Sequence, residues 1–432
     1  MRRAGAAERL GRAPLRAAAL ACAAALLAVA GLAPGSSGAT QSSTVLAATP
    51  YMGWDTYFTF GTHYDEATIL AQASALQTSG LERDGYRLIW LDVGWWPGTR
   101  SSDGRITVSS KQWPHGMAWL TRTLHAEGFQ VGLYTDAGKK GCGGIHEGSY
   151  GHYQQDVNTF AAWSFDAVKV DFCGGDALHL NPTTAYGKFH DAILHNSSHR
   201  PMLLDICVFP QPGQAGNGLP SFADSAFSSY DFGPSVGNSW RTDTDVGSPA
   251  GVPWSSVLRN LDADATEPSA AGPGHWNDPD YLGPDLGLTD AQFQTQFSMW
   301  AMLAAPLMVS GNIASISPAS LATISNRQMI AIDQDPAGIQ ASLVSASGDG
   351  EVWMKPLLDG HVAIALLNRG ELPLTISTSA QALSTAPGSQ FPAAASYTLA
   401  NVWTGTSSTT TGAISAAVAP DSTVVFVVSA AA

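Results

Sequence analysis

A lysine and an aspartate lie inside a run of branched apolar residues near the middle of the chain, in AVKVDFC (167–173). Lys169 and Asp171 are two residues apart, and side chains at i and i+2 of a strand point to the same side of it. The ammonium group can therefore keep the aspartate ionised and also bind a substrate hydroxyl group. An ionised carboxylate is the form in which an aspartate acts as a nucleophile. A buried structural ion pair is the alternative interpretation.

A second pair of opposite charges stands in NSWRTDTD (238–245), where Arg241 and Asp245 are four residues apart. We expect Asp245 to serve as a general acid and base. Asp243 is a rival for this role, because on a strand it would have the same parity as Asp245.

Acidic and aromatic residues also end most of the other apolar runs. They are Trp54, Asp55 and Tyr57; Asp92, Val93, Trp95 and Trp96; Tyr134 and Asp136; and Trp276, Asp278 and Asp280. One such acid is often only a helix cap, but the repetition indicates a shared site. Tryptophan faces stack on sugar rings and carboxylates accept hydrogen bonds from hydroxyl groups, so the set favours a carbohydrate ligand. Hydrolysis of a glycosidic bond needs two carboxyl groups, and we expect those of Asp171 and Asp245 to face each other at roughly 5–7 Å.

Eight apolar runs must hold these side chains in place. They span residues 52–58, 86–96, 129–136, 167–173, 201–209, 238–245, 274–282 and 306–312. Most intervals between them have helical spacing, as in Ile69, Ala73 and Leu76 before Gly80. This alternation predicts an α/β fold, a (β/α)8 TIM barrel over residues 40–339, with its active site at the C-terminal ends of the strands. A doubly wound open sheet is the alternative, but the chain shows no glycine-rich phosphate loop.

The pattern changes after about Pro336. Val362, Ile364 and Leu366 alternate with other residues after a turn at 358–361, and 423–428 is a β-branched run. No helical repeat is apparent there. We predict a small antiparallel β-sandwich domain over residues 340–432, with a structural role against the barrel rather than a role in sugar binding.

The first 39 residues resemble a secretory signal peptide. Five arginines precede an alanine- and leucine-rich run from Ala17 to Ala33. Ser37-Gly38-Ala39 follows and fits a small-x-small cleavage site. The run is short for a membrane span. Removing these five arginines and one glutamate changes the net charge from −14 to −18. We therefore expect a secreted protein, and the acidic charge argues against nucleic acid or an anionic membrane as partner.

Cysteine is sparse in the expected mature chain. Cys142, Cys173 and Cys207 remain after the signal peptide, which carries Cys22, is removed. An odd number in an exported protein allows at most one intrachain bridge and leaves a free thiol.

Taken together, these motifs resemble glycoside hydrolase family 27, the α-galactosidase and α-N-acetylgalactosaminidase family. The resemblance runs from about Tyr51 to Gln340. It rests on MGW (52–54), the D-G-R and W-P-H-G motifs within 103–116, GLYTDAG (132–138), KVDFC (169–173), NSWRTDTD (238–245), GPGHWNDPDYL (272–282) and IDQDP (332–336).

The resemblance implies roles for individual residues of this chain. Asp171 would be the nucleophile and Asp245 the acid/base of a retaining double displacement on an α-glycoside. Contacts to the terminal sugar would come from Trp54, Tyr57, Asp92, Tyr134, Lys169, Arg241 and Asp280. Cys142 and Cys173 would form a disulfide beside the nucleophile, and Cys207 would be a free buried thiol. No metal or organic cofactor is implied.

Two positions depart from the usual pattern of galactoside-cleaving relatives. Those relatives commonly have two adjacent aspartates after the second strand, where this chain has Asp92-Val93. They also have a glutamate after the strand-five cysteine, where this chain has Val208. A hydrogen bond to a charged group contributes about 1.5–3 kcal/mol, so two losses would weaken galactose binding roughly a hundredfold or more.

Three functions remain open at this point. The family majority favours an α-galactosidase-type enzyme, whereas Val93 and Val208 fit the isomalto-dextranase branch of the family, which acts on α-1,6-glucan. A carbohydrate-binding protein without activity is the third, but it would need a lost carboxylate, and both Asp171 and Asp245 are present.

Overall fold

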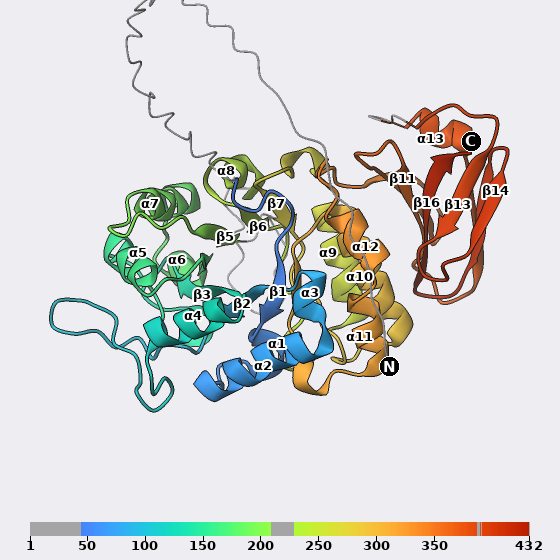
Figure 1. Cartoon of the computed structure of the whole chain (residues 1–432). Coiled ribbons are helices and arrows are strands. Elements are labelled where there is room, and N and C mark those ends of the chain that lie inside the picture. Colours follow the sequence, from blue (N-terminus) through green and yellow to red (C-terminus); the bar gives the residue numbers. More distant parts are fainter. Residues whose placement is uncertain (1–44, 209–228, 387–388, 390, 432) are drawn as a thin grey trace, which may run out of the picture. The chain divides into compact units, whose positions relative to one another are not determined.

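The structure, a computed structural model, describes residues 45–208, 229–386, 389 and 391–431 (Figure 1). The predicted signal peptide, residues 1–39, lies outside this part of the chain. Among the described residues, none of the helices has both the length and the apolar character needed to cross a membrane.

Eight parallel strands form one curled sheet, as the sequence predicts. They are β1 (Met52–Asp55), β2 (Leu88–Leu91), β3 (Gln130–Asp136), β4 (Ala167–Asp171), β5 (Leu203–Cys207), β6 (Ser239–Arg241), β7 (Trp276–Asp278) and β8 (Leu307–Val309). Their order in the sheet is β7-β6-β5-β4-β3-β2-β1-β8. This sequential order is that of a barrel and rules out the doubly wound alternative.

The sheet closes between β7 and β8 beyond the end of β7. Leu282 and Val309 form a parallel bridge, in which the Leu282 N–H donates to the Met308 carbonyl at 2.8 Å and the Ser310 N–H donates to the Leu282 carbonyl at 2.8 Å. The (β/α)8 barrel is thus closed through the segment that follows β7.

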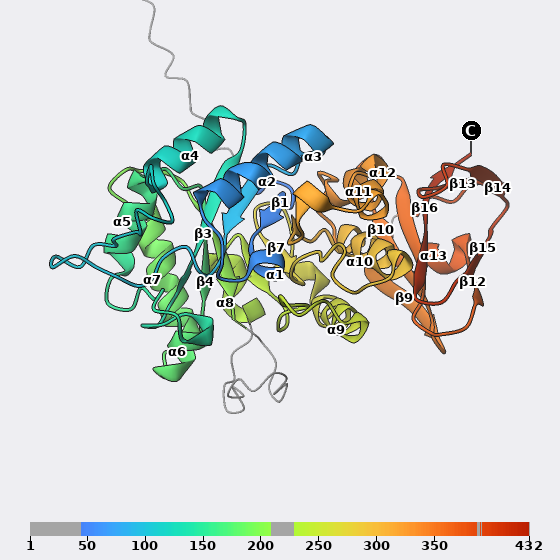
Figure 2. The ribbon, with the colours of Figure 1, turned by 90° about the horizontal axis from the view of Figure 1, so that it is seen from below.

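Helices encircle the strands, as Figure 2 shows. They are α1 (Tyr57–Phe60), α2 (Glu66–Ser79), α3 (Leu81–Asp84), α4 (Met117–Ala126), α5 (Tyr153–Ala162), α6 (Cys173–Ala177), α7 (Pro182–Leu194), α8 (Ser229–Val236), α9 (Trp254–Asp264), α10 (Asp290–Leu303), α11 (Pro318–Ile324) and α12 (Arg327–Asp333). Three 3-10 turns, η1 (Cys142–Gly144), η2 (Pro268–Ala270) and η3 (Ile313–Ser315), lie between them. Helix α2 begins where the Asp65 carboxylate caps Thr68 N at 2.9 Å, and it ends at Gly80 with φ +91°.

Residues beyond the barrel form an antiparallel β-sandwich, as expected. One sheet has the order β14-β13-β16-β11-β10-β9, and the other pairs β12 with β15. The strands are β9 (Ser342–Ser347), β10 (Gly350–Pro356), β11 (Val362–Asn368), β12 (Leu374–Ser379), β13 (Tyr397–Asn401), β14 (Ser407–Thr410), β15 (Ala413–Val418) and β16 (Ser422–Ala430). One short helix, α13 (Ala380–Ser384), follows β12 although the sequence shows no helical repeat there; five residues are too few for a periodic pattern.

Strand β11 explains how the sandwich joins the barrel. Ala363, Ala365 and Leu367 belong to the hydrophobic core shared with the barrel, whereas Ile364 and Leu366 face the second sheet. Both faces of β11 are therefore buried, which the alternation in the sequence did not reveal.

Polar contacts strengthen the same junction. The Asp421 carboxylate accepts hydrogen bonds from Trp254 Nε1 at 2.8 Å and from Gln292 Nε2 at 2.9 Å. Trp403 Nε1 donates to Ser298 Oγ in α10 at 3.1 Å.

Candidate active site

A cavity of about 490 Å³ lies at the C-terminal ends of the barrel strands. It is lined by Tyr57, Thr62, Asp92, Val93, Tyr134, Cys142, Gly143, Ile145, Lys169, Asp171, Cys173, Cys207, Thr244, Asp245, Gly247 and Ser248. A cavity of similar size, about 500 Å³, opens near the other ends of the strands. Size alone does not identify the site, but only the first cavity holds the acids predicted from the sequence, at the end where barrels carry their active sites.

The Asp171 side chain is nearly buried in the wall of this cavity and has several hydrogen-bond donors. Its Oδ1 accepts from Phe172 N at 2.8 Å, and its Oδ2 accepts from the Tyr134 hydroxyl at 3.0 Å. Burial raises the pKa of Asp171 to about 6, although the positive charge of Lys169 and these two donors lower it. Lys169 therefore favours the ionised carboxylate as expected, but burial has the larger effect.

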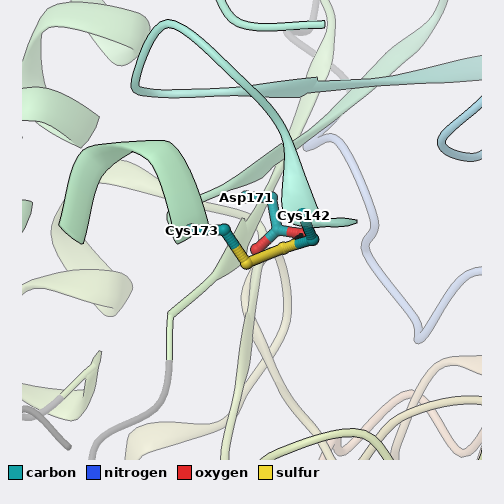
Figure 3. Close-up of side chains that lie close together, drawn as sticks. All are labelled: Cys142, Asp171 and Cys173. Atoms are coloured by element: carbon teal, nitrogen blue, oxygen red, sulfur yellow. Dashed lines mark hydrogen bonds between the residues drawn. A yellow bond between two sulfur atoms is a disulfide. The ribbon is translucent and has the colours of Figure 1, made fainter. Parts of the chain in front are cut away.

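A disulfide between Cys142 and Cys173 lies against Asp171 (Figure 3). The sulfur of Cys142 is 2.8 Å from Asp171 Oδ2. Three potential metal ligands thus lie together, but sulfur atoms in a disulfide are not thiolates and do not bind a metal as thiolates would. The bridge is the one expected, and Cys207 is a free, buried thiol that lines the cavity.

Asp245 is the more exposed acid of the cavity. Its side chain is 38% exposed, and its Oδ1 is 3.2 Å from Arg241 Nη1. The buried Arg241 also pairs with Asp280 at 3.0 Å. One guanidinium thus holds a cavity acid and a buried acid, and burial raises the pKa of Asp280 to about 7 against the effect of Arg241.

The rival acid Asp243 points elsewhere. Its Oδ2 is 3.3 Å from Arg259 Nε, its side chain is 2% exposed, and it is not among the lining residues of the cavity. Strand β6 ends at Arg241, so the parity that suggested Asp243 does not continue to it.

Lys169 has its closest partners across the barrel. Its Nζ donates to Asp92 Oδ2 at 2.8 Å and to the Tyr281 hydroxyl at 2.8 Å, and that hydroxyl donates to Asp92 Oδ2 at 2.9 Å. The Lys169 ammonium therefore pairs directly with Asp92. Its positive charge acts on Asp171 only through space.

The expectation that tryptophans face the sugar is wrong for all four of them. Trp54, Trp95, Trp96 and Trp276 are fully buried. Trp54 Nε1 donates to the Gly311 carbonyl at 2.7 Å, and Trp95 Nε1 donates to the Tyr134 carbonyl at 2.8 Å. They pack inside the barrel wall, and Tyr57 is the aromatic ring predicted from the sequence that does line the cavity, together with Tyr134.

Val93 and Val208, the two residues that depart from the family pattern, differ in their relation to the cavity. Val93 lines the cavity, whereas Val208 is buried and is not among the lining residues. Four of the predicted sugar contacts line the cavity, namely Tyr57, Asp92, Tyr134 and Lys169, and so do Asp171 and Asp245. Two others do not: Arg241 pairs with Asp245, and Asp280 pairs with Arg241.

Sequence reasoning missed the buried residues Glu147 and Tyr281, and it gave Asp136 no role beyond its place at the end of a strand. The Asp136 carboxylate accepts from Gly174 N at 3.1 Å, and burial together with Asp171 raises the pKa of Asp136 to about 8. The Glu147 carboxylate accepts from Gly94 N at 2.9 Å and from Trp96 N at 2.7 Å. Nothing local marked Glu147 or Tyr281.

Comparison with known proteins agrees with this geometry. Residues 50–335 match the sequence model of the family described as "Alpha galactosidase A", and residues 347–428 match that of the "Alpha galactosidase C-terminal beta sandwich domain". Alpha-galactosidase A of Cellvibrio japonicus is 39% identical over 338 residues, 76% of this chain and 77% of its own length. Alpha-galactosidase 2 of Arabidopsis thaliana is 33% identical over 77% of this chain and 78% of its own. The structure of the α-galactosidase from Saccharomyces cerevisiae with raffinose has the same fold, with a TM-score of 0.77 at 24% identity over 89% of this chain and 98% of that one.

Proposed function

Because the chain belongs to the α-galactosidase family, glycoside hydrolase family 27, and is therefore a glycoside hydrolase of the α-galactosidase type, we propose that it releases terminal α-linked galactose with retention of configuration. Asp171 is the nucleophile and Asp245 the acid/base in this proposal. One observation carries it: these two carboxyl groups line the same cavity, one buried among hydrogen-bond donors and the other exposed.

In the first step, the ionised Asp171 attacks the anomeric carbon. The glycosidic bond breaks, and Asp245 gives its proton to the leaving oxygen, so the remainder of the substrate departs as an alcohol. A covalent ester joins the sugar to Asp171. The Tyr134 hydroxyl and the Phe172 N–H donate hydrogen bonds to the Asp171 carboxylate. These two bonds support the orientation of its attacking oxygen.

In the second step, Asp245 takes a proton from water, and the water oxygen attacks the anomeric carbon. The ester bond breaks, Asp171 returns as a carboxylate, and Asp245 is protonated again. Two inversions give net retention. The exposure of Asp245 supports this role, because its proton must exchange with leaving groups and with water.

The terminal sugar would be held by polar groups of the cavity. Asp92 and Lys169 line it with opposite charges and suit a hydroxyl group that both donates and accepts. Tyr57 offers a ring. Arg241, which is paired with Asp280, is buried outside the cavity lining and holds Asp245 in place. Trp54 is fully buried and does not belong to this set.

We further propose that the protein is secreted after removal of residues 1–39, with the catalytic barrel at residues 40–339 and the sandwich at 340–432. The leader-like composition of the first 39 residues and the disulfide beside Asp171 support export.

A second substrate class is favoured by one observation. Val93 puts an apolar side chain in the cavity wall next to Asp92, where it offers no partner to a sugar hydroxyl. An α-1,6-glucan, in the manner of the isomalto-dextranase branch, is therefore the second candidate substrate.

The two substrates are separated by one experiment. The purified protein is incubated with p-nitrophenyl α-galactoside and, in parallel, with dextran, with Asp171→Ala as the inactive control. Rapid nitrophenol release, with α-galactose as the first anomer seen by NMR, is expected. Disaccharide release from dextran with a feeble galactoside rate would instead assign the glucan, and β-galactose as first product would refute retention.

The acid/base role has its own test. Asp245→Asn should slow cleavage of a galactosyl disaccharide far more than that of the nitrophenyl galactoside, because nitrophenolate leaves without a proton. Asp243→Asn is the matched control, since that side chain pairs with Arg259 outside the cavity lining. Equal effects of the two variants would refute the assignment.

A further inference from the structure

Tyr281 closes a triangle of hydrogen bonds behind the cavity wall. Its hydroxyl is 2.8 Å from Lys169 Nζ and 2.9 Å from Asp92 Oδ2, and Lys169 Nζ is 2.8 Å from the same carboxylate oxygen. The ammonium also lies 4.7 Å from the centre of the Tyr281 ring. Lys169 and Asp92 line the cavity, and Tyr281 is not among the lining residues.

The remaining capacity of each group follows from counting donors and acceptors. Asp92 Oδ1 accepts from Val93 N at 2.7 Å, and its Oδ2 accepts from both partners in the triangle. An ammonium has three N–H groups, of which two are directed at Asp92 and Tyr281. Two fixed acceptors determine the direction of the third N–H group, because the ammonium is tetrahedral. A substrate hydroxyl group in the cavity is the partner that this third N–H group fits.

The backbone before Tyr281 has an uncommon conformation. Asp280 has φ +84°, a region that side chains other than glycine seldom adopt. The Asp280 N–H donates to Asp278 Oδ1 at 2.8 Å, and its carbonyl accepts from Trp300 Nε1 at 2.7 Å. This turn directs Asp280 toward Arg241 and the next residue, Tyr281, toward Lys169. Local strain held by surrounding contacts is typical of functional sites.

We propose that Tyr281 is a positioning residue, which fixes the Asp92–Lys169 pair so that it recognises one hydroxyl group of the terminal sugar. The inference rests on the proposed function, because it concerns the same cavity. Without the phenol hydroxyl, Lys169 keeps one fixed acceptor and its ammonium can rotate, so the third N–H group loses its direction.

The neighbouring carboxyl group of Asp55 is compatible with this arrangement. Burial, together with the charge of Asp92, raises the pKa of Asp55 well above its usual range, and the Tyr281 hydroxyl lowers it. The carboxyl group of Asp55 therefore favours its neutral form. It does not compete with Asp92, whose Oδ2 pairs with Lys169 Nζ at 2.8 Å.

The test is a double-mutant cycle between the enzyme and the substrate. Tyr281→Phe removes the hydroxyl and keeps the ring. The substrates are p-nitrophenyl α-galactoside and analogues that each lack one sugar hydroxyl group. In the wild type, one analogue should lose tenfold or more in kcat/KM, in line with a hydrogen bond to a charged group. In Tyr281→Phe, we expect the penalty for that same analogue to shrink at least about threefold, while the penalties for the others stay unchanged.

Tyr64→Phe is the matched control. The Tyr64 hydroxyl donates to the backbone carbonyl of Asp92, not to its carboxylate. Tyr64→Phe therefore also removes a buried phenol hydrogen bond to Asp92, but leaves the bonds to the Asp92 carboxylate in place. A merely structural role of Tyr281 would give both variants the same uniform loss of kcat/KM across all analogues. Unchanged penalties for every analogue in Tyr281→Phe would overturn the proposal.

The experiment also provides for a variant that does not fold and for a wild type that does not cleave the galactoside. If Tyr281→Phe does not fold, Tyr281→Met fills the space without a hydroxyl and replaces it in the cycle. If the wild type does not cleave the parent galactoside, the proposed substrate is wrong. The cycle is then run on the nitrophenyl glycoside of the sugar that the enzyme does release, where the same selective change is expected.

Discussion

Tyr134→Phe should change the pH dependence of catalysis in a specific way. The Tyr134 hydroxyl donates to Asp171 Oδ2 at 3.0 Å and lowers the pKa of Asp171, which burial raises to about 6. A nucleophile acts only when it is ionised, so kcat/KM of the wild type should rise with pH through about 6 and level off above it. Removing the hydroxyl raises the pKa of Asp171 and moves this rise to higher pH.

The size of the shift follows from the lost hydrogen bond. A hydrogen bond to a charged group contributes about 1.5 kcal/mol or more, which corresponds to about one pKa unit. With the pKa moved from about 6 to about 7, the ionised fraction at pH 5 falls from about 9% to about 1%. At pH 8 it falls only from about 99% to about 91%. The defect should thus be about ninefold at pH 5 and nearly absent at pH 8.

The assay is kcat/KM for p-nitrophenyl α-galactoside between pH 4 and 9, with the ratio of wild type to variant plotted against pH. A lost contact to the sugar would lower activity equally at every pH, so the change of the ratio isolates the effect on Asp171. Tyr186→Phe is the control, because the Tyr186 hydroxyl donates to the carbonyl of Val170, next to Asp171, at 2.9 Å. A ratio that stays constant between pH 5 and pH 8 would refute the reasoning.

Three further changes have expected outcomes. Burial raises the pKa of Glu147 to about 8, so the folded state binds the proton more tightly than the unfolded chain and stability is lost as pH rises toward 8. The Tm of Glu147→Gln minus that of the wild type should therefore grow between pH 5 and pH 8, and a constant difference would contradict this. Replacing Cys142 and Cys173 by serine opens a bridge with a sequence separation of 31 residues; the free energy of unfolding in urea should fall by about 3–4 kcal/mol, and a loss below about 1 kcal/mol would be inconsistent with it. Asp421→Ala removes the acceptor of Trp254 in the barrel and should lower the free energy of unfolding by about 1–3 kcal/mol, with kcat/KM unchanged at 25 °C.

The architecture was largely predictable because strand and helix periods differ. All eight predicted segments contain the observed strands. Most of these strands, such as β2 and β4, are nearly continuous in apolar residues, as strands buried on both faces are, whereas β6 and β7 are largely polar. The acids at their ends could be listed for the same reason: in a barrel the C-terminal strand ends meet at one face. Asp171 and Asp245, the proposed catalytic pair, were listed in this way.

Residues in loops could not be placed by the same rules. Parity separates inward from outward side chains only within a strand, so it could not show that Asp243 turns to Arg259 or that Trp95 and Trp96 are buried in the wall. Tyr281 and Glu147 depend on partners far away in the sequence. Their roles arise from tertiary contacts that no local pattern encodes.

The closure of the barrel makes one part of its wall easier to open than the rest. The bridge between Leu282 and Val309 joins β7 to β8 at one position beyond the end of β7, whereas the other neighbouring strands pair at two to five consecutive positions. In native-state hydrogen exchange, the amides of Leu282 and Ser310 should therefore exchange sooner than those inside β3 and β4. Because Tyr281 directly precedes Leu282, such an opening would release the anchor of Lys169 while the rest of the barrel stays folded. In mild denaturant, sugar affinity should then decline before the tryptophan fluorescence of the core changes.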